Sequence, residues 1–279
     1  MQNQKKNLLI HLGPPKTGTT SLQHWLLSNE DRGFSYIGIK PKRYDEKKNK
    51  HANVFLKYIY GNKNKNDFVS YLNNLSHYKN LMYSEELILY GENWICNLKK
   101  LACLQDSFNI HLAYCYRNSI KAIPSAYAEY HSNLNPKLKK SFELFLHSEF
   151  VKPYKLDEVI NVFNELNLKF HIFDFEKLVK EKLCIDDLFG INSEIPFFKR
   201  RIRLSTENKT KKSELNSYTA KVQTPEQLKL ELKIRKLSNK YFKKDFSNYF
   251  KRSYKIKINK TDELLKIANN NEKTWSNID

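Results

Sequence analysis

Residues 8–20 of the chain read LLIHLGPPKTGTT, and the fold that we expect follows from this stretch. Residues 7–12 are apolar enough to form a buried strand, and residues 18–28 carry apolar side chains at the spacing of a helix. The glycines and prolines between them predict a tight turn that joins the strand to the helix. Backbone N–H groups at such a turn, together with the positive end of the helix dipole, bind anions. The sequence therefore predicts an anion-binding loop after the first strand.

The loop has the glycine spacing of a Walker phosphate loop, but its lysine is in another position. A Walker loop follows the pattern G-x-x-x-x-G-K-[ST], in which the lysine comes directly after the second glycine. Here Gly13 and Gly18 keep the spacing and Thr20 keeps the hydroxyl. Thr19 stands at the lysine position, and Lys16 lies three residues earlier. This arrangement argues against an ordinary ATP-binding loop.

The rest of the chain alternates between predicted strands and helices. Further strands are expected at residues 81–83, 109–116 and 170–175, and helices at 52–61, 67–77, 119–131, 157–167 and 262–275. Such alternation is typical of a mainly parallel sheet covered by helices on both faces. We therefore expect an α/β, P-loop-like three-layer fold. It would form a single domain over residues 1–279, with a helical C-terminal appendage over about residues 224–279.

Three of the predicted strands end in polar side chains that suit an active site. Lys16, Glu85 and Arg117 each lie just past a strand end. In parallel sheets, ligands bind at the carboxyl ends of the strands. We therefore expect these three residues to converge at one edge of the sheet.

The composition is that of a globular protein with anionic partners. Hydrophobic residues make up 40% of the chain and the formal net charge is +19, which suits a nucleotide, nucleic acid, an acidic glycan or a membrane surface. The four cysteines have no C-x-x-C spacing and predict reduced, mostly buried thiols. No apolar run is long enough for a signal peptide or a membrane span, so we expect a cytoplasmic protein.

On the stretch HLGPPKTGTTSLQ, residues 11–23, the chain resembles sulfotransferases that use 3′-phosphoadenosine 5′-phosphosulfate (PAPS). The 5′-phosphosulfate loop of that family has the pattern P-K-[ST]-G-T-T. This chain matches it without a gap at Pro15, Lys16, Thr17, Gly18, Thr19 and Thr20. The longer stretch is similar to bacterial members that sulfate glycans. The resemblance implies that Lys16 contacts the 5′-phosphate and the oxygen that bridges phosphorus and sulfur, and it implies no metal.

The resemblance also implies a site for the 3′-phosphate of the nucleotide. In the family, an arginine after a strand and a serine eight residues later bind this phosphate, and Arg117 and Ser125 match that spacing. Ser119 departs from the family, which usually has proline there. A late basic loop closes over the nucleotide in the family. The candidates for it here, which could equally form a solvated basic loop, are Arg203, Ser205, Lys211, Lys212 and Ser213.

Sulfuryl transfer to a hydroxyl needs a base, and the stretch MYSEEL, residues 82–87, supplies the candidates. Glu85 resembles the S-E element found at this point in bacterial members, and Glu86 stays open as an alternative. Both acids would also favour the start of a helix. His51 lies just ahead of a predicted helix and is a candidate for acceptor binding.

These expectations describe a PAPS-dependent sulfotransferase that acts on a hydroxyl of a carbohydrate acceptor. Two alternatives stay open: a P-loop nucleotide kinase or ATPase, and a non-catalytic polyanion-binding protein. Thr19 at the Walker lysine position argues against the first alternative. The chain has no recognisable DNA- or RNA-binding motif, so we expect no nucleic-acid partner.

Overall fold

A computed structural model describes residues 5–40, 47–61, 63–75, 78–181, 183–202, 217–222 and 254–278, with a few single positions between 224 and 237. The chain divides into two compact units. The first contains residues 1–117, 152–209 and 274–279, and the second contains residues 118–151 and 210–273. The single domain expected from the sequence stays a prediction.

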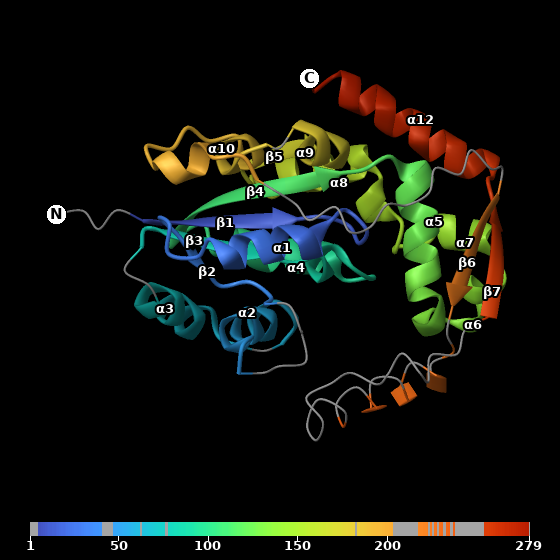
Figure 1. Ribbon diagram of the computed structural model, residues 1–279, viewed down its shortest axis with the longest axis horizontal. Helices are drawn as coiled ribbons and strands as arrows, with labels where there is room; N and C mark the ends of the chain where they lie inside the picture. Colours follow the sequence, from blue (N-terminus) through green and yellow to red (C-terminus); the bar gives the residue numbers. More distant parts are fainter. Residues whose placement is uncertain are drawn as a thin grey trace. The chain divides into compact units, whose positions relative to one another are not determined.

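The first unit is built on a five-stranded parallel sheet in the order β2-β3-β1-β4-β5 (Figure 1). The strands are β1 (Lys6–Leu12), β2 (Ser35–Tyr36), β3 (Asn80–Ser84), β4 (Phe108–Tyr116) and β5 (Phe170–Asp174). In Figure 1, β1 and β4 run side by side with their arrowheads at the same end of the sheet. Because all five strands are parallel, the loops that follow them leave from one edge.

The alternation of side chains along β1 supplies both faces of the sheet. Leu8, Ile10 and Leu12 point to one face, and Leu9 points to the other. All four side chains are buried. A strand that is buried on both faces reads as a continuous apolar run, and this explains the sequence pattern around residue 10.

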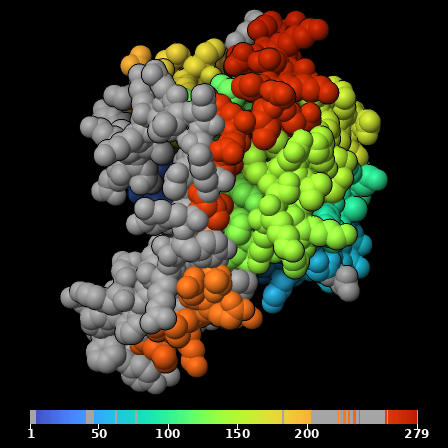
Figure 2. Space-filling model, turned by 90° about the vertical axis from the view of Figure 1, so that its right-hand side faces the viewer, coloured from blue at the N-terminus to red at the C-terminus, as the bar shows by residue number. Residues whose placement is uncertain are grey.

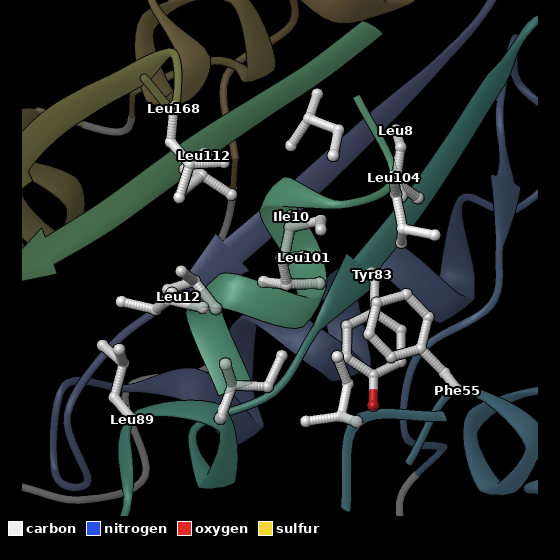
Figure 3. Close-up of a cluster of buried hydrophobic side chains, with 14 of the residues drawn as sticks. Leu8, Ile10, Leu12, Phe55, Tyr83, Leu89, Leu101, Leu104, Leu112 and Leu168 are labelled. Atoms are coloured by element: carbon white, nitrogen blue, oxygen red, sulfur yellow. The ribbon is translucent and has the colours of Figure 1, made fainter. Parts of the chain in front are cut away.

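Within the described ranges, the face that Leu8, Ile10 and Leu12 enter is covered by helices that contribute buried side chains to the same core. They are α2 (Lys50–Tyr60), α3 (Lys65–Leu75), α4 (Trp94–Ala102) and α8 (Leu156–Glu165). Figure 3 shows this core, in which Leu101 of α4 lies close to Ile10 and the ring of Phe55 stacks on Tyr83, with 3.8 Å between ring centroids. The opposite face is covered by α1 (Thr19–Ser28), α9 (Phe175–Glu181) and α10 (Ile185–Phe189).

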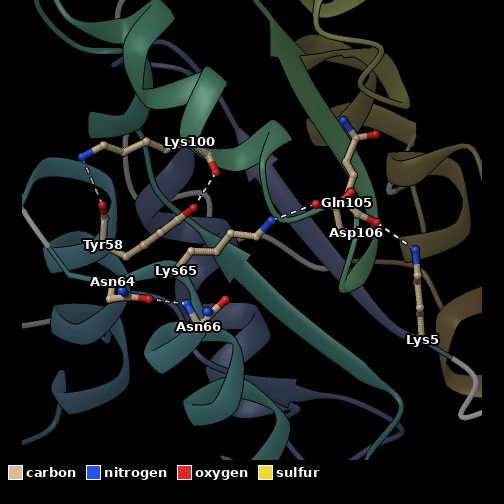
Figure 4. Close-up of polar contacts among 8 residues, drawn as sticks. All are labelled: Lys5, Tyr58, Asn64, Lys65, Asn66, Lys100, Gln105 and Asp106. Atoms are coloured by element: carbon tan, nitrogen blue, oxygen red, sulfur yellow. Dashed lines mark hydrogen bonds and ion pairs between the residues drawn. The ribbon is translucent and has the colours of Figure 1, made fainter.

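Polar contacts join the helices of the first face to each other and to the turn before β4 (Figure 4). Tyr58 of α2 donates its hydroxyl to the carbonyl of Lys100 in α4 at 2.9 Å, and Lys100 Nζ donates to the carbonyl of Tyr58 at 3.3 Å. Lys65 of α3 forms an ion pair with Asp106 at 2.8 Å. These contacts lie away from the carboxyl ends of the strands.

The second unit contains helices and a two-stranded antiparallel sheet. Its elements are α5 (Ser119–Tyr130), η2 (His131–Asn133), α6 (Pro136–Lys140), α7 (Phe142–Leu146), β6 (Ser217–Val222), β7 (Tyr254–Asn259) and most of α12 (Asp262–Ser276). Asn271 of α12 donates to Ser119 Oγ at 2.6 Å. In Figure 2, α12 (red) accordingly lies against the green surface of residues 118–151.

The predicted fold class is confirmed, since a parallel sheet is flanked by helices on both faces and a helix ends the chain. Thr224 and Gln227 form a capping box, in which the N–H of Thr224 donates to Gln227 Oε1 at 2.8 Å and the N–H of Gln227 donates to Thr224 Oγ1 at 3.2 Å. Further short helical turns are η1 (Leu87–Leu89), η3 (Lys152–Tyr154) and η4 (Pro196–Lys199).

Some features differ from the sequence analysis. The strands β2, β6 and β7 were not predicted, although Ile256 and Ile258 alternate with lysines in β7 and so carry a period-two signal. The expectation of mostly buried cysteines is wrong for Cys96 and Cys103, because both are exposed at α4.

Candidate functional site

The parallel sheet brings three of the predicted polar positions to one edge. The loop of residues 13–18 follows β1, Glu85 follows β3 and Arg117 follows β4. β1 lies between β3 and β4, with His11 in register with Ser84 on one side and with Ala113 on the other. The expected convergence of the three strand ends is therefore present within the first unit.

The loop that follows β1 adopts the left-handed conformation twice in three residues. Lys16 has φ 72° and Gly18 has φ 79°. Gly18 is the N-cap of α1, and it has no side chain that could cap that helix end. The first N–H groups of α1 thus receive no bond from the N-cap residue, and the helix dipole adds positive potential there. This is the geometry that binds an anion at a helix N-terminus.

The three loop threonines differ in their surroundings. Thr17 is buried and donates its hydroxyl to the carbonyl of Pro14 at 2.8 Å, so its hydrogen is used within the loop. Thr19 is also buried, and its Oγ1 has no hydrogen-bond partner among the described residues. Thr20 is exposed at the start of α1. Thr19 therefore offers the buried hydroxyl that still lacks a partner.

Arg117 reaches from the end of β4 to the loop. Its Nη1 donates a hydrogen bond to the backbone carbonyl of Lys16, and its guanidinium lies over the ring of Phe175, 5.0 Å from the centroid. Its Nε is buried and has no hydrogen-bond partner within the described part of the chain. Phe175 also packs against Gly18 so closely that an added Cβ would collide with its ring. The two sequence motifs thus meet in space.

Glu85 is fully buried at the end of β3. Its backbone N–H donates to the carbonyl of His11 at 3.2 Å, and its Oε1 accepts from the N–H of Leu87 at 3.0 Å. Gln23 of α1 donates to the carbonyl of Ser84 at 3.0 Å and holds the same strand end. Glu86 is half-buried at the start of η1. Glu85 is joined through its backbone to β1, the strand that leads into the loop.

His11 is buried beneath the loop and stays neutral. Its Nδ1 lies 2.9 Å from Ser84 Oγ, and its ring lies 5.8 Å from the ring of Phe173. Burial lowers the pKa of His11 from 6.5 to about 3. Protonation is therefore disfavoured in this site, and the neutral His11 ring joins β1 to β3 through Ser84 Oγ.

His51 forms a pair with Tyr71 of α3, with 2.6 Å between His51 Nδ1 and the tyrosine hydroxyl. Burial lowers the pKa of His51, and the nearby charges of Lys40 and Lys50 lower it further. No described contact joins His51 to the loop after β1. Its role as an acceptor-binding residue stays a prediction.

The remaining candidates lie elsewhere in the chain. Ser125 belongs to α5 of the second unit and is half-buried. The candidates of the basic loop, which are Arg203, Ser205, Lys211, Lys212 and Ser213, lie outside the described residues.

Among the described residues, sequence reasoning missed two side chains that form hydrogen bonds with the loop, besides the ring of Phe175 that packs on Gly18. The hydroxyl of Tyr154, in η3, donates to the carbonyl of Pro15 at 3.1 Å, and Cys115 Sγ lies 3.4 Å from the carbonyl of Thr17. Burial raises the pKa of the Cys115 thiol, so it remains protonated as a donor. No local pattern marks Tyr154, because it lies 139 positions from Pro15 in the chain.

No family model matches the chain, and no curated protein matches it. The fold is similar to the crystal structure of a sulfotransferase from Alicyclobacillus acidocaldarius, with a TM-score of 0.44 and 13% identity over 89% of this chain and 99% of that chain. A likeness of this size supports no conclusion about the fold or the reaction, so both are argued from the residues.

Within the described ranges, no cluster of three or more histidine, cysteine, aspartate or glutamate side chains is arranged to hold a metal ion. Among the helices of the described part of the chain, none is long and apolar enough to cross a bilayer.

Proposed function

We propose that this protein is a cytoplasmic sulfotransferase that moves the sulfuryl group of PAPS to a hydroxyl of a carbohydrate acceptor. One observation supports it above the others: the Arg117 guanidinium contacts the backbone of Lys16, so the two motifs of the sequence belong to one site. A nucleotide with phosphates at both its 5′ and 3′ positions needs two such groups of donors close together. The net charge of +19 favours a ligand of this kind.

In this proposal, the loop after β1 holds the 5′-phosphosulfate. The uncapped N–H groups of α1 and the buried hydroxyl of Thr19 donate to its oxygens. Lys16 stabilises the oxygen that bridges phosphorus and sulfur, because negative charge develops there as the bond to sulfur breaks. Arg117 binds the 3′-phosphate through the part of its guanidinium that does not contact Lys16. Ser125 stays a second candidate for this phosphate on its spacing from Arg117 in the sequence alone.

Glu85 takes the proton of the acceptor hydroxyl in the proposed reaction. A new bond forms between the acceptor oxygen and sulfur, the bond from sulfur to the bridging oxygen breaks, and the proton passes to Glu85. The products are the sulfated acceptor and adenosine 3′,5′-bisphosphate. Because the Glu85 side chain is fully buried, acceptor binding must open its surroundings, and Glu86 stays the alternative base.

A kinase or ATPase is the weaker proposal. In P-loop enzymes of that class, an aspartate after a strand helps to hold magnesium. Asp174 at the end of β5 is the candidate, but its Oδ1 accepts a hydrogen bond from the N–H of Glu176 at 2.6 Å and serves the start of α9. β5 is also separated from β1 by β4. Thr19 stands at the position of the Walker lysine, which also argues against a kinase or ATPase.

Calorimetry with two nucleotides tests the proposal. We expect adenosine 3′,5′-bisphosphate to bind tightly and ADP with magnesium to bind weakly. Arg117→Lys keeps the charge but loses the planar fork, so its affinity for the bisphosphate should fall by about ten-fold or more. Lys16→Ala should also weaken binding, whereas Lys99→Ala, an exposed position in α4 with the same change of charge, should not. Preferred binding of ADP with magnesium would instead identify a kinase or ATPase.

The base assignment has its own test, since it depends on chemistry rather than on nucleotide affinity. Glu85→Gln keeps the shape of the side chain and its acceptor oxygen for Leu87, so affinity for adenosine 3′,5′-bisphosphate should not change. Turnover with PAPS should fall by about a hundred-fold or more, because general-base catalysis contributes that much. Glu86→Gln is the matched control. If only Glu86→Gln lost turnover, Glu86 rather than Glu85 would be the base.

A further inference from the structure

We propose that Tyr154 is a positioning residue of the loop that follows β1, and that it acts together with Arg117 and Cys115 by holding the carbonyl groups of that loop. The loop N–H groups are thereby turned toward the bound anion. The identity of the anion rests on the proposed function, whereas the conformation of the loop does not. Tyr154 would contact no part of the nucleotide and would act through the backbone of the loop.

Four consecutive carbonyl groups of the loop each accept a hydrogen bond from a side chain. The carbonyl of Pro14 accepts from Thr17 Oγ1 at 2.8 Å, and that of Pro15 accepts from the Tyr154 hydroxyl at 3.1 Å. The carbonyl of Lys16 accepts from Arg117, and that of Thr17 accepts from Cys115 Sγ at 3.4 Å. Three of the four donors come from outside the loop.

Because the peptide bond is planar, these contacts also determine the direction in which the N–H groups of the loop point. In a trans peptide, the carbonyl of one residue and the N–H of the next point in opposite directions. A carbonyl that is held against the protein therefore turns the following N–H away from that contact. The carbonyls of Pro15, Lys16 and Thr17 precede the N–H groups of Lys16, Thr17 and Gly18. These three N–H groups lead directly into the uncapped start of α1.

The conformation of Lys16 also requires such support. Lys16 has φ 72°, which a residue with a side chain adopts only when its surroundings impose it. The carbonyls on both sides of its Cα, those of Pro15 and Lys16, are held by Tyr154 and Arg117. The two contacts together fix the backbone from which the Lys16 side chain extends.

Tyr154 is itself well placed to hold the loop. Its side chain is buried, with 4% exposed, and it lies in the short helical turn η3. The residue before it, Pro153, accepts a hydrogen bond through its carbonyl from the hydroxyl of Tyr114 at 2.6 Å. Tyr114 lies in β4, as does Cys115, and Arg117 follows β4 directly. The strand β4 is thus the rigid element that supports all three contacts.

Tyr154→Phe tests the inference, because it removes only the hydroxyl. Hydrogen exchange of a peptide that covers residues 13–20 in the unliganded full chain should become about five-fold faster, as one hydrogen bond to the loop is lost. Affinity for adenosine 3′,5′-bisphosphate should fall by a similar factor. Tyr58→Phe is the matched control, since it removes a tyrosine hydroxyl that donates to the distant carbonyl of Lys100. It should change neither measurement.

The outcomes separate this inference from the proposed function. Unchanged exchange in Tyr154→Phe, or an equal change in both variants, would overturn the positioning role. So would faster exchange with unchanged affinity. If exchange accelerates in Tyr154→Phe alone while the wild-type protein binds no bisphosphate, the positioning role is supported and the proposed nucleotide is wrong.

Cys115 provides a second pair of variants that does not depend on Tyr154. Cys115→Ala removes the donor to the Thr17 carbonyl, and we expect exchange of the loop to become about two-fold faster, since a thiol is a weak donor. Cys115→Ser restores a donor of similar size and should return exchange to the wild-type rate or below it. Equal exchange in the alanine and serine variants would contradict a role for this contact.

Discussion

Lys16 and Gly18, in the loop after β1, both have a positive φ, which is an uncommon backbone conformation. At Gly18 the absence of a side chain serves two purposes. It permits φ 79° without strain, and it leaves room for the ring of Phe175. At Lys16 the same conformation is adopted by a residue with a long side chain, so its backbone has to be held by neighbours.

Gly18→Ala should therefore affect both stability and binding. The positive φ alone destabilises the folded state by about 1–2 kcal/mol, and the collision of the new Cβ with Phe175 adds to this. Gly91→Ala is the matched control, because Gly91 has φ 84° with open space around its Cβ position. Urea denaturation should show a smaller loss of stability for Gly91→Ala. Affinity for adenosine 3′,5′-bisphosphate should fall only in Gly18→Ala, and a fall in both variants would contradict this account.

At the scale of elements, the contact between β1 and β3 depends on a histidine that stays neutral. His11 and Ser84 are in register, and their side chains lie 2.9 Å apart beneath the loop. Because burial lowers the pKa of His11 to about 3, the folded protein binds a proton there less readily than the unfolded chain, whose pKa is near 6.5. The stability that this difference supplies is present above the unfolded pKa and is lost as the pH falls from about 6.5 toward 3.

His11→Asn should remove this part of the pH dependence. At about pH 5, protonation of the unfolded chain at His11 destabilises the wild-type fold by about 2 kcal/mol relative to about pH 7.5. The variant should lose less stability than the wild type over that range in urea denaturation, whatever its stability at neutral pH. His24→Asn, at an exposed position of α1, should keep the wild-type dependence. If the free energy of unfolding changed with pH by the same amount in all three proteins, His11 would not titrate as its burial implies.

Much of the element pattern could be predicted from the sequence because its signals are local. The start of α5 follows from Asn118, whose side chain caps the helix by accepting from the N–H of Ile120 at 3.0 Å. The break between α6 and α7 was not predicted, although Ser141 caps α7 by accepting from the N–H of Leu144 at 3.2 Å. β2 could not be predicted, because a strand of two residues has no periodicity to detect. Its register with Leu81 and Met82 depends on the sheet that surrounds it.

At the scale of the whole molecule, the net charge of +19 raises the local concentration of any anion. It therefore favours a sulfotransferase with an anionic nucleotide and a non-catalytic polyanion-binding protein alike. Long-range attraction of this kind is screened by salt. A built site with directed N–H donors keeps more of its affinity in salt, because its hydrogen bonds are short-ranged. Salt dependence therefore distinguishes a nucleotide site from a surface that binds any polyanion.

A heparin oligosaccharide is a suitable polyanion for this comparison. Its affinity should fall by about ten-fold or more between about 50 and 200 mM salt, since binding releases counterions. Adenosine 3′,5′-bisphosphate should lose less affinity over the same range, and Arg117→Ala should weaken the nucleotide much more than heparin. Parallel losses for both ligands, with no effect of Arg117→Ala, would favour the non-catalytic polyanion-binding protein.

By itself, the sequence determined the strand, loop and helix around Lys16 and the alternation that makes a parallel sheet, since apolar period, glycine and helix caps act between neighbours in the chain. Only the tertiary structure decided that β3 and β4 flank β1, that Glu85 is buried, and that Tyr154 holds the carbonyl of Pro15. These contacts join segments far apart in sequence. Their partners are chosen by packing and by hydrogen bonding of buried groups, which leave no repeating pattern along the chain.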